Sequence, residues 1–210
     1  PTETITMTGI DDVKNLGFMF KFDRTKFFNG YRKYFGPMDS SLVKSLDTLL
    51  TQIEADERFR ASKDFRTPRR QLAYCLATFK WETAHTMRPI KEYGGAAYFN
   101  KRYGPQTSVG KRLGNIKPGD GARFCGRGFV QLTGRSNYDK AGKYVGVDLI
   151  NSPEKACNPD IAYRIATEGM IEGWFTGRKL SNYFVDGKLP QWEQARRIIN
   201  GLDKSAKIAS

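Results

Sequence analysis

Apolar residues recur at helical spacing along most of this chain, and short polar residues mark where several helices should begin. Asp23 is a candidate N-cap for a first helix that opens around residues 22–28, because a short acceptor there satisfies free backbone donors. Ser40 or Ser41 is the candidate cap of a second helix. The predicted buried face of this second helix consists of Leu42, Leu46, Leu49, Leu50 and Ile53.

A third predicted helix carries a carboxylate on its apolar face. It starts at Thr67-Pro68, since proline is tolerated in the first turn of a helix. The face continues onto Glu82, where burial would disfavour the charged form and leave an acid that keeps its proton near neutral pH. The alternative is a structural glutamate paired with a nearby arginine or lysine. The apolar positions that lead to it are Leu72, Cys75, Leu76 and Phe79.

Helical spacing then stops between residues 89 and 124, where glycine and proline turn signals alternate with aromatic residues. These signals include Gly94-Gly95, Gly104-Pro105 and the run at 118–121. We expect a long irregular region with room for a short β-hairpin. Because structureless stretches of this length inside a compact domain are usually functional, we expect it to line a ligand site.

Helices are predicted again in the last third of the chain. One spans residues 136–145, another starts at 151–154, and Asn158-Pro159 opens a third. This third helix has a small-sided apolar face that suits a central packing helix. A final helix over residues 191–200 ends at Gly201. The small-sided face consists of Ile161, Ala162, Ile165, Ala166, Gly169 and Met170.

Composition indicates one globular catalytic domain over residues 1–210, with no separate wall-binding domain. The 210 residues are 39% hydrophobic and 13% aromatic, and they contain no apolar run long enough to span a membrane. The net charge of +13 favours attraction to polyanions. The three cysteines form no CxxC pair and histidine occurs once, so we expect no zinc site, no other metal and no cofactor.

Two carboxylates on either side of a glycosidic bond are the minimum equipment for its hydrolysis. Glu82 is the candidate acid, and Glu92, which follows a short turn in a polar setting, is the candidate base. Two carboxyls in contrasting environments are typical of such pairs. Taken alone, a glutamate in the position of Glu92 is more often a solvated loop charge.

Polar orienting groups follow in residues 126–137. The Thr133 hydroxyl could hold the attacking water, while the amides of Gln131 and Asn137 could bind sugar hydroxyls or an N-acetyl group. Turn and capping roles are the alternative for Thr133 and Asn137. Tyr93, Tyr98 and Tyr103 could offer flat amphipathic surfaces to sugar rings. The alternative is that they form a small hydrophobic core for the loop itself.

These motifs together resemble glycoside hydrolase family 19, which contains plant-type chitinases and many bacteriophage endolysins. The resemblance covers about residues 67–205, and residues 1–66 resemble the helical lead-in of the endolysin-like members less distinctively. The motifs that carry it are Trp81-Glu82-Thr83-Ala84-His85-Thr86, Glu92-Tyr93-Gly94, Tyr103-Gly104, residues 126–133, Asn137-Tyr138 and Ile198-Ile199-Asn200-Gly201.

The resemblance implies a mainly helical, lysozyme-like α+β fold with two lobes, a cleft and a small irregular or β-hairpin region. It implies that Glu82 is the general acid and that Thr133 positions the water. It places Gln131, Asn137 and Asn200 among the substrate-binding residues, and we predict substrate contact for Arg127 and for the three tyrosines as well.

The chain departs from the family's chitinases in two places, and the second departure favours peptidoglycan over chitin. Trp81 stands where those enzymes usually carry a histidine, and their second carboxylate lies farther along the chain than Glu92 does. The endolysin-like members resemble the shorter spacing. The predicted function is therefore hydrolysis of β-1,4 bonds in peptidoglycan, with a chitinase as the alternative. The assignment of Glu92 as the base is weaker than that of Glu82 as the acid.

The expected partners are peptidoglycan strands and the anionic bacterial envelope. We expect no specific binding of nucleic acid, and we expect the protein to be a monomer. The chain shows no signal peptide, so we expect synthesis in a host cytoplasm and action on the wall after the membrane is permeabilised.

Two other classes of function remain open. One is an amidase or endopeptidase that uses Cys125 and His85. The other is a non-catalytic wall-binding or nucleic-acid-binding module attracted by charge alone.

Overall fold

The computed structural model describes residues 21–59, 66–201 and 208, and over these residues the chain is mainly helical with one two-stranded sheet. This confirms the predicted fold class. Within the described part, no helix is long and apolar enough to cross a bilayer. The longer elements are α1 (Arg24–Phe35), α2 (Ser40–Ala55), α3 (Arg66–Glu82), α4 (Ala96–Tyr103), α7 (Arg135–Val145) and α8 (Pro159–Glu172). The shorter ones are η1 (Glu57–Phe59), β1 (Ile90–Lys91), α5 (Ser108–Arg112), α6 (Asp120–Arg123), β2 (Arg127–Gly128), η2 (Pro153–Cys157), η3 (Leu180–Asn182) and η4 (Gln194–Ile198).

The two N-terminal helices begin at aspartates. Asp23 caps α1 by accepting a hydrogen bond from the Lys26 amide, as predicted. The cap of α2 is Asp39, whose Oδ1 accepts from the Leu42 amide at 2.7 Å. The prediction of a serine cap at residue 40 or 41 is therefore wrong, because the carboxylate one residue earlier already satisfies the free donor. The predicted lead-in is only partly visible, since its residues 1–20 and 60–65 lie outside the described residues.

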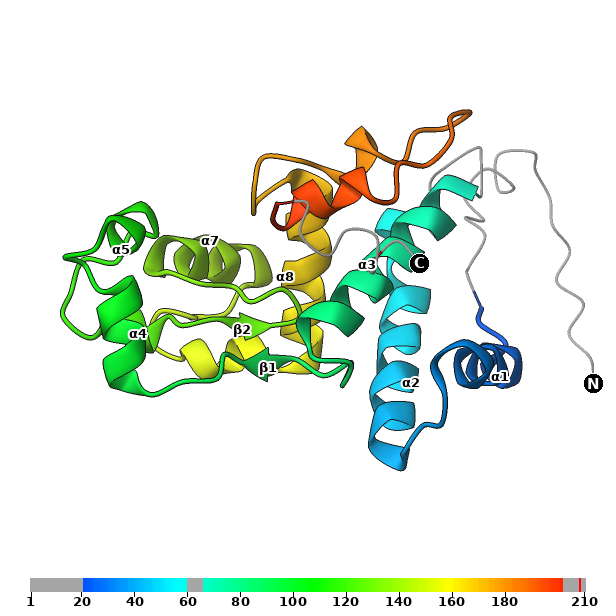
Figure 1. Cartoon of the computed structure of the whole chain (residues 1–210), viewed down its shortest axis with the longest axis horizontal. Helices are drawn as coiled ribbons and strands as arrows, with labels where there is room; N and C mark the ends of the chain where they lie inside the picture. Colours follow the sequence, from blue (N-terminus) through cyan, green and yellow to red (C-terminus); the bar gives the residue numbers. More distant parts are fainter. Residues whose placement is uncertain (1–20, 60–65, 202–207, 209–210) are drawn as a thin grey trace, which may run out of the picture.

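Helix α8 lies at the centre of the molecule, between the N-terminal helices α1–α3 and the part formed by α4–α7 (Figure 1). Asn158 caps it, and Pro159 occupies its first turn. Small residues let its neighbours approach: a Cβ on Gly169 would lie 2.2 Å from the ring of Phe175. Helix α8 packs against α2 and α7, which confirms the predicted central packing helix.

The region between residues 89 and 124 is more ordered than its glycines and prolines suggest. It contains β1 and the short helices α4, α5 and α6, so the expectation of a long structureless stretch is wrong. Here the glycines permit close backbone packing. A Cβ on Gly121 would lie 2.5 Å from the Phe99 carbonyl oxygen, and one on Gly110 would lie 2.0 Å from that of Gly104.

Two other predicted helices are shorter and tighter than expected. The start signal at residues 151–154 leads into η2, a 3₁₀ helix. The final predicted helix, over residues 191–200, is reduced to η4, also a 3₁₀ helix. Short 3₁₀ segments are common connectors, and propensity alone rarely separates them from α-helices.

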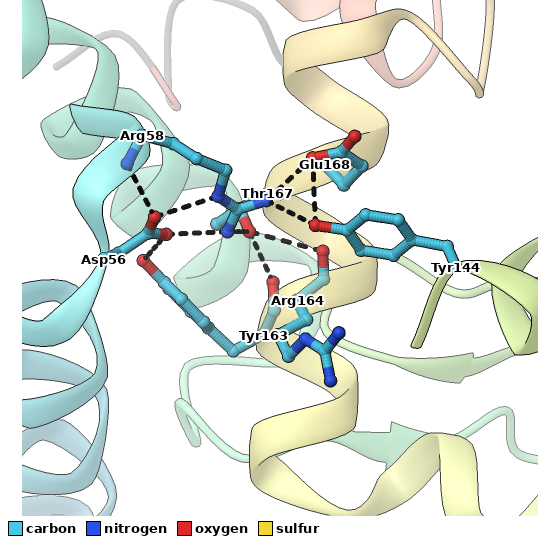
Figure 2. Close-up of polar contacts among 7 residues, drawn as sticks. All are labelled: Asp56, Arg58, Tyr144, Tyr163, Arg164, Thr167 and Glu168. Carbon is cyan, nitrogen blue, oxygen red and sulfur yellow. Dashed lines mark hydrogen bonds and ion pairs between the residues drawn. The ribbon is translucent and has the colours of Figure 1, made fainter. Parts of the chain in front are cut away.

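A partly exposed polar network connects η1 to α8 and α7 (Figure 2). The guanidinium of Arg58 is its centre. It donates to both carboxylate oxygens of Asp56 at 2.9 and 2.6 Å, and to Thr167 Oγ1 at 2.7 Å. It also donates to Glu168 Oε2 at 2.9 Å and to the Tyr144 hydroxyl at 3.0 Å. Since each of these donors has an acceptor, the network supports the fold and leaves little capacity for a ligand.

The same network holds Asp56 in its charged form. The Tyr163 hydroxyl donates to Asp56 Oδ2 at 2.8 Å. Burial opposes ionisation of this carboxyl, but the hydrogen bonds from Arg58 prevail and lower the pKa of Asp56. The connection between α2 and α8 is therefore partly electrostatic.

Candidate active site

Glu82 is the last residue of α3, and its neighbour Thr83 determines where the helix ends. The buried Thr83 hydroxyl donates to the Phe79 carbonyl at 2.7 Å and accepts from the Met87 amide at 3.0 Å. A threonine that bonds back onto the preceding turn competes with helix continuation. The chain therefore leaves the helix immediately after Glu82.

The turn that follows Glu82 is conformationally strained. Ala84, His85 and Met87 adopt positive φ angles of 50°, 66° and 52°, which side chains other than glycine rarely do. The His85 amide donates to the Lys80 carbonyl at 2.7 Å, which closes the helix end. Backbone strain of this kind clusters at functional sites, where the surrounding structure maintains it.

The carboxylate of Glu82 is held by an arginine from the far end of the chain. Arg196 Nη1, on η4, donates to Glu82 Oε1 at 2.6 Å, and the two side chains are 4% and 18% exposed. The carboxyl is thus largely shielded but is not isolated among apolar groups, which corrects that expectation. The alternative of a glutamate paired with a basic residue describes its surroundings correctly.

Arg196 is the site residue that the sequence interpretation missed. Its signal was present, because it lies next to Ala195 and two residues before Ile198, both of which are buried. An arginine on a buried face needs an acceptor. The backbone amide of Asn200 donates to the Arg196 carbonyl at 3.0 Å, so the predicted substrate-binding Asn200 is linked to the group that holds Glu82.

Glu92 lies directly after β1, and its carboxylate is bonded on both oxygens. Oε1 accepts from the Tyr103 hydroxyl at 2.9 Å, and Oε2 accepts from the Gly126 amide at 3.1 Å. The backbone amide of Glu92 donates to the Gly126 carbonyl at 2.8 Å. Burial, with the hydrogen bond to Glu92, raises the pKa of Tyr103 to about 12, so this phenol remains a donor. Glu92 is therefore a fixed group and not a loose loop charge.

Gln131 is brought against Glu92 by the strand pairing. Strands β1 and β2 pair antiparallel with Lys91 opposite Arg127, and Gln131 follows in a tight turn with a φ of 56°. A Cβ on Gly126 would lie 2.6 Å from Gln131 Oε1 and 3.1 Å from Glu92 Oε2. The ends of the Gln131 and Glu92 side chains therefore both lie close to Gly126.

Thr133 and Asn137 make local backbone hydrogen bonds. Thr133 Oγ1 donates to the Gln131 carbonyl at 2.8 Å, and Asn137 Nδ2 donates to the Thr133 carbonyl at 2.7 Å. Both side chains are half-buried. The turn and capping roles considered for them are thus present, while the Thr133 oxygen keeps its lone pairs for a water molecule.

Arg127 makes hydrogen bonds within the protein and is not open to solvent. Its side chain is buried, and Nη1 donates to the Arg123 carbonyl and to the Tyr138 hydroxyl, both at 2.9 Å. The Tyr138 hydroxyl in turn donates to the Cys125 carbonyl at 2.8 Å. The predicted direct contact of Arg127 with substrate is at odds with this burial, and we correct its role to a structural one.

The three predicted aromatic residues differ in exposure. Tyr93 is strongly exposed beside Glu92, Tyr98 is exposed and accepts a hydrogen bond from Arg102, and Tyr103 is buried against Glu92. Tyr93 and Tyr98 therefore offer surfaces to a ligand. Tyr103 acts through the carboxylate that it contacts.

The surroundings of Cys125 argue against a cysteine nucleophile. Its thiol is fully buried, and burial raises the pKa of Cys125, whereas a reactive cysteine needs an exposed thiolate. His85 is exposed on the strained turn, with its ring at 6.0 Å from that of Trp81.

Comparison with known proteins matches this arrangement to a family. The model of the family described as chitinase class I, glycoside hydrolase family 19, matches residues 38–196. The chain belongs to glycoside hydrolase family 19. The matched range contains Glu82, Glu92 and the segment 126–137, and it ends at Arg196.

Plant chitinases are among the similar sequences of family 19. Chitinase 11 of Oryza sativa subsp. japonica is 31% identical over 166 residues, which cover 71% of this chain and 59% of the rice protein. The acidic 27 kDa endochitinase of Solanum lycopersicum is 59% identical over a shorter stretch of 59 residues, which covers 28% of this chain and 22% of the tomato protein. The chain therefore spans less than two thirds of the length of these relatives.

A solved family 19 structure shares the fold. Chitinase C from Streptomyces griseus HUT6037 superposes with a TM-score of 0.52 and 20% sequence identity, over 93% of this chain and 94% of that one. At this identity the likeness concerns the fold alone. It supports the lysozyme-like architecture expected from the sequence.

Proposed function

We propose that this protein hydrolyses β-1,4 bonds between N-acetylated amino sugars, with the glycan strands of peptidoglycan as its substrate. The observation that carries the proposal is the contrast between two carboxyls. Glu82 is paired with Arg196 at the end of α3, and Glu92 accepts hydrogen bonds from Tyr103 and Gly126 after β1. Two carboxyls in different settings suit one acid and one base.

In the proposed mechanism Glu82 donates its proton to the oxygen that leaves as the glycosidic bond breaks. The described residues give Glu82 Oε2 no hydrogen-bond partner, so this oxygen is available to a substrate. Arg196 then stabilises the carboxylate that remains after proton transfer. Glu82 must be protonated before the reaction, and the return of the proton from solvent completes the cycle.

Glu92 would take a proton from the attacking water, which Thr133 orients. Its two bonded oxygens fix its direction, while their remaining lone pairs can accept the proton. Gln131, whose side-chain amide lies close to Gly126 as the Glu92 carboxylate does, is placed to bind the sugar next to the broken bond. Tyr93 and Tyr98 would support sugar rings farther away.

The choice of peptidoglycan rests on charge. With 35 basic and 22 acidic residues the protein is attracted to the anionic polymers of bacterial envelopes over roughly 8–10 Å in physiological salt. Chitin is the second candidate, and it is favoured by the names of the relatives, which are chitinases and endochitinases.

Mass spectrometry of the products tests both candidates. Purified peptidoglycan and colloidal chitin are digested in parallel, and the new chain ends identify the bond broken.

The rate of hydrolysis by the Glu82→Gln variant should be about 10²–10⁴-fold lower, as expected for a missing general acid. Glu193→Gln, at an exposed site near η4, is the matched control. Unchanged hydrolysis by a folded Glu82→Gln variant would refute the mechanism, and loss of activity in Cys125→Ser alone would favour an amidase.

A further inference from the structure

Helix α1 has the composition of a helix that lies on a membrane surface. Its 12 residues include five aromatic and four basic side chains and no acidic one, and none of the 12 is buried. Tyr34 and Phe35, at its C-terminal end, are 74% and 55% exposed. Basic residues beside exposed aromatic rings are typical of interfacial helices. Helix α1 lies at the edge of the molecule (Figure 1).

An apolar pocket of about 400 Å³ lies between α1, α2 and α3. A volume in this range suits a small ligand or part of a lipid chain. The described residues that line it include Lys26 and Lys80 but no aspartate or glutamate. Its apolar walls include Phe27, Tyr31, Phe35, Leu46, Leu76 and Met87.

Lys80 places a positive charge at this pocket. Its Nζ lies 3.1 Å from the centre of the Phe35 ring and 5.4 Å from that of Tyr31. Among the described residues no carboxylate is in ion-pair contact with it, and burial lowers the pKa of Lys80. A partly desolvated ammonium of this kind would gain from an anionic group at the pocket mouth.

Gly30 leaves one wall of the pocket open. A Cβ at this position would meet no atom within 4 Å, so free space adjoins the helix there. A larger side chain at position 30 would occupy this space without displacing a neighbour. It would also favour the helix, because glycine is a poor helix former.

We propose that α1 and the pocket behind it bind the surface of an anionic phospholipid membrane, with part of one acyl chain in the pocket. The apolar walls suit the chain, while Lys26, Lys80, Arg32 and Lys33 suit the phosphates. A second copy of this protein fits less well, because two α1 faces without acidic residues would repel each other. This inference goes beyond the proposed glycosidase activity and does not depend on it.

Flotation of the full chain with vesicles tests the proposal. The protein should float with vesicles of phosphatidylglycerol and phosphatidylcholine in equal parts and stay behind with phosphatidylcholine alone. Replacing Tyr34 and Phe35 together by serine should lower binding about 10-fold or more, because two aromatic rings no longer leave water. The Leu189→Ser variant removes an apolar side chain that is 87% exposed elsewhere on the protein, and it should bind like wild type.

Two further variants separate the pocket and the local charge from general attraction. Gly30→Leu should fill the pocket and weaken binding while circular dichroism shows an intact fold. The double variant Arg32→Ser, Lys33→Ser should bind more weakly than Lys101→Ser, Lys111→Ser, which loses the same net charge from other exposed sites.

Three results would overturn the proposal. The first is wild-type binding in Gly30→Leu or in the Tyr34 and Phe35 variant. The second is an equal loss in the two charge variants, which would indicate net charge alone. The third is a dimer in analytical ultracentrifugation that dissociates when Tyr34 and Phe35 are replaced, which would identify a second copy as the occupant.

Discussion

Arg196 donates a 2.6 Å hydrogen bond to Glu82 across 114 residues of sequence. The pair joins the end of α3 to η4, and the arginine is almost completely buried. The arginine fixes one oxygen of the carboxyl. In the proposed mechanism it also supplies the charge that stabilises the carboxylate after proton transfer. The first prediction concerns this contact.

Replacing Arg196 by leucine should lower kcat about 10²-fold, because the carboxylate formed in the reaction loses its charged donor. Arg196→Lys should retain part of the activity, since it keeps the charge but not the geometry. Arg197→Leu, at the exposed neighbouring position, is the control. Steady-state kinetics together with thermal unfolding separates loss of catalysis from loss of folded protein. Equal kcat in the two leucine variants would contradict the assigned role.

Replacing Tyr103 by phenylalanine should lower kcat about 10-fold with little change in KM. The variant keeps the ring but removes the hydroxyl that donates to Glu92 Oε1, so the base is less firmly oriented. It should also shift the pH–rate profile, an effect that lost packing alone would not produce. Tyr34→Phe removes an exposed hydroxyl on α1, outside the candidate active site, and should leave both constants unchanged. Identical pH profiles for wild type and Tyr103→Phe would argue that this hydrogen bond is only structural.

Acid should destabilise the protein through Asp120. Burial opposes ionisation of this carboxyl, but Arg135 and the backbone amides of Lys117 and Ile116 lower the pKa of Asp120 from 3.8 to about 2. A carboxyl with a lowered pKa in the folded state contributes stability that is complete above its ordinary pKa. That stability, about 2 kcal/mol, is lost as the pH falls through the folded-state pKa.

Urea unfolding at a series of acidic pH values measures this contribution. Asp120→Asn should be about 2 kcal/mol less stable at neutral pH and should show a flatter pH dependence. Asp139→Asn, in the exposed pair with Lys143, should change stability by less than about 0.5 kcal/mol. A parallel pH dependence in Asp120→Asn and wild type would disprove the contribution.

Arg58→Leu should destabilise the fold by about 3 kcal/mol, because Asp56 and Glu168 would be left near each other without their shared cation. Activity per folded molecule should change little, since the network in Figure 2 does not contact Glu82 or Glu92. Arg112→Leu, at an exposed position of α5, should be neutral. Calorimetric melting of the three proteins gives the comparison, and equal melting temperatures would rule out a stabilising network.

The regular helices could be predicted because their apolar spacing and capping residues agree. Asp23 and Asn158 cap α1 and α8 where expected, whereas α2 was predicted from its apolar spacing and its cap is Asp39 instead of a serine. The region of α4–α6 could not be predicted from local patterns. Its glycines read as turns, but Gly110 and Gly121 are required by backbones that approach from elsewhere in the fold.

The candidate site was predictable as a set of residue types but not as a set of contacts. The sequence indicated Glu82, Glu92 and Gln131, while Arg196 depends on how η4 folds back onto α3. Arg127 is the opposite case, a residue predicted to contact substrate whose hydrogen bonds in the fold are structural. Its place in a polar motif predicted contact with substrate, but its side chain is buried and donates to the Tyr138 hydroxyl.

The pairing of β1 with β2 forms a neck at the base of the segment that contains α4, α5 and α6. Both groups that meet at Gly126, the carboxylate of Glu92 and the amide of Gln131, are attached at this neck. Lengthening or shortening the excursion between the strands would therefore reshape the walls around a substrate while leaving that junction in place. Such an arrangement would let the same pair of residues, Glu92 and Gln131, serve polymers whose side groups differ in size.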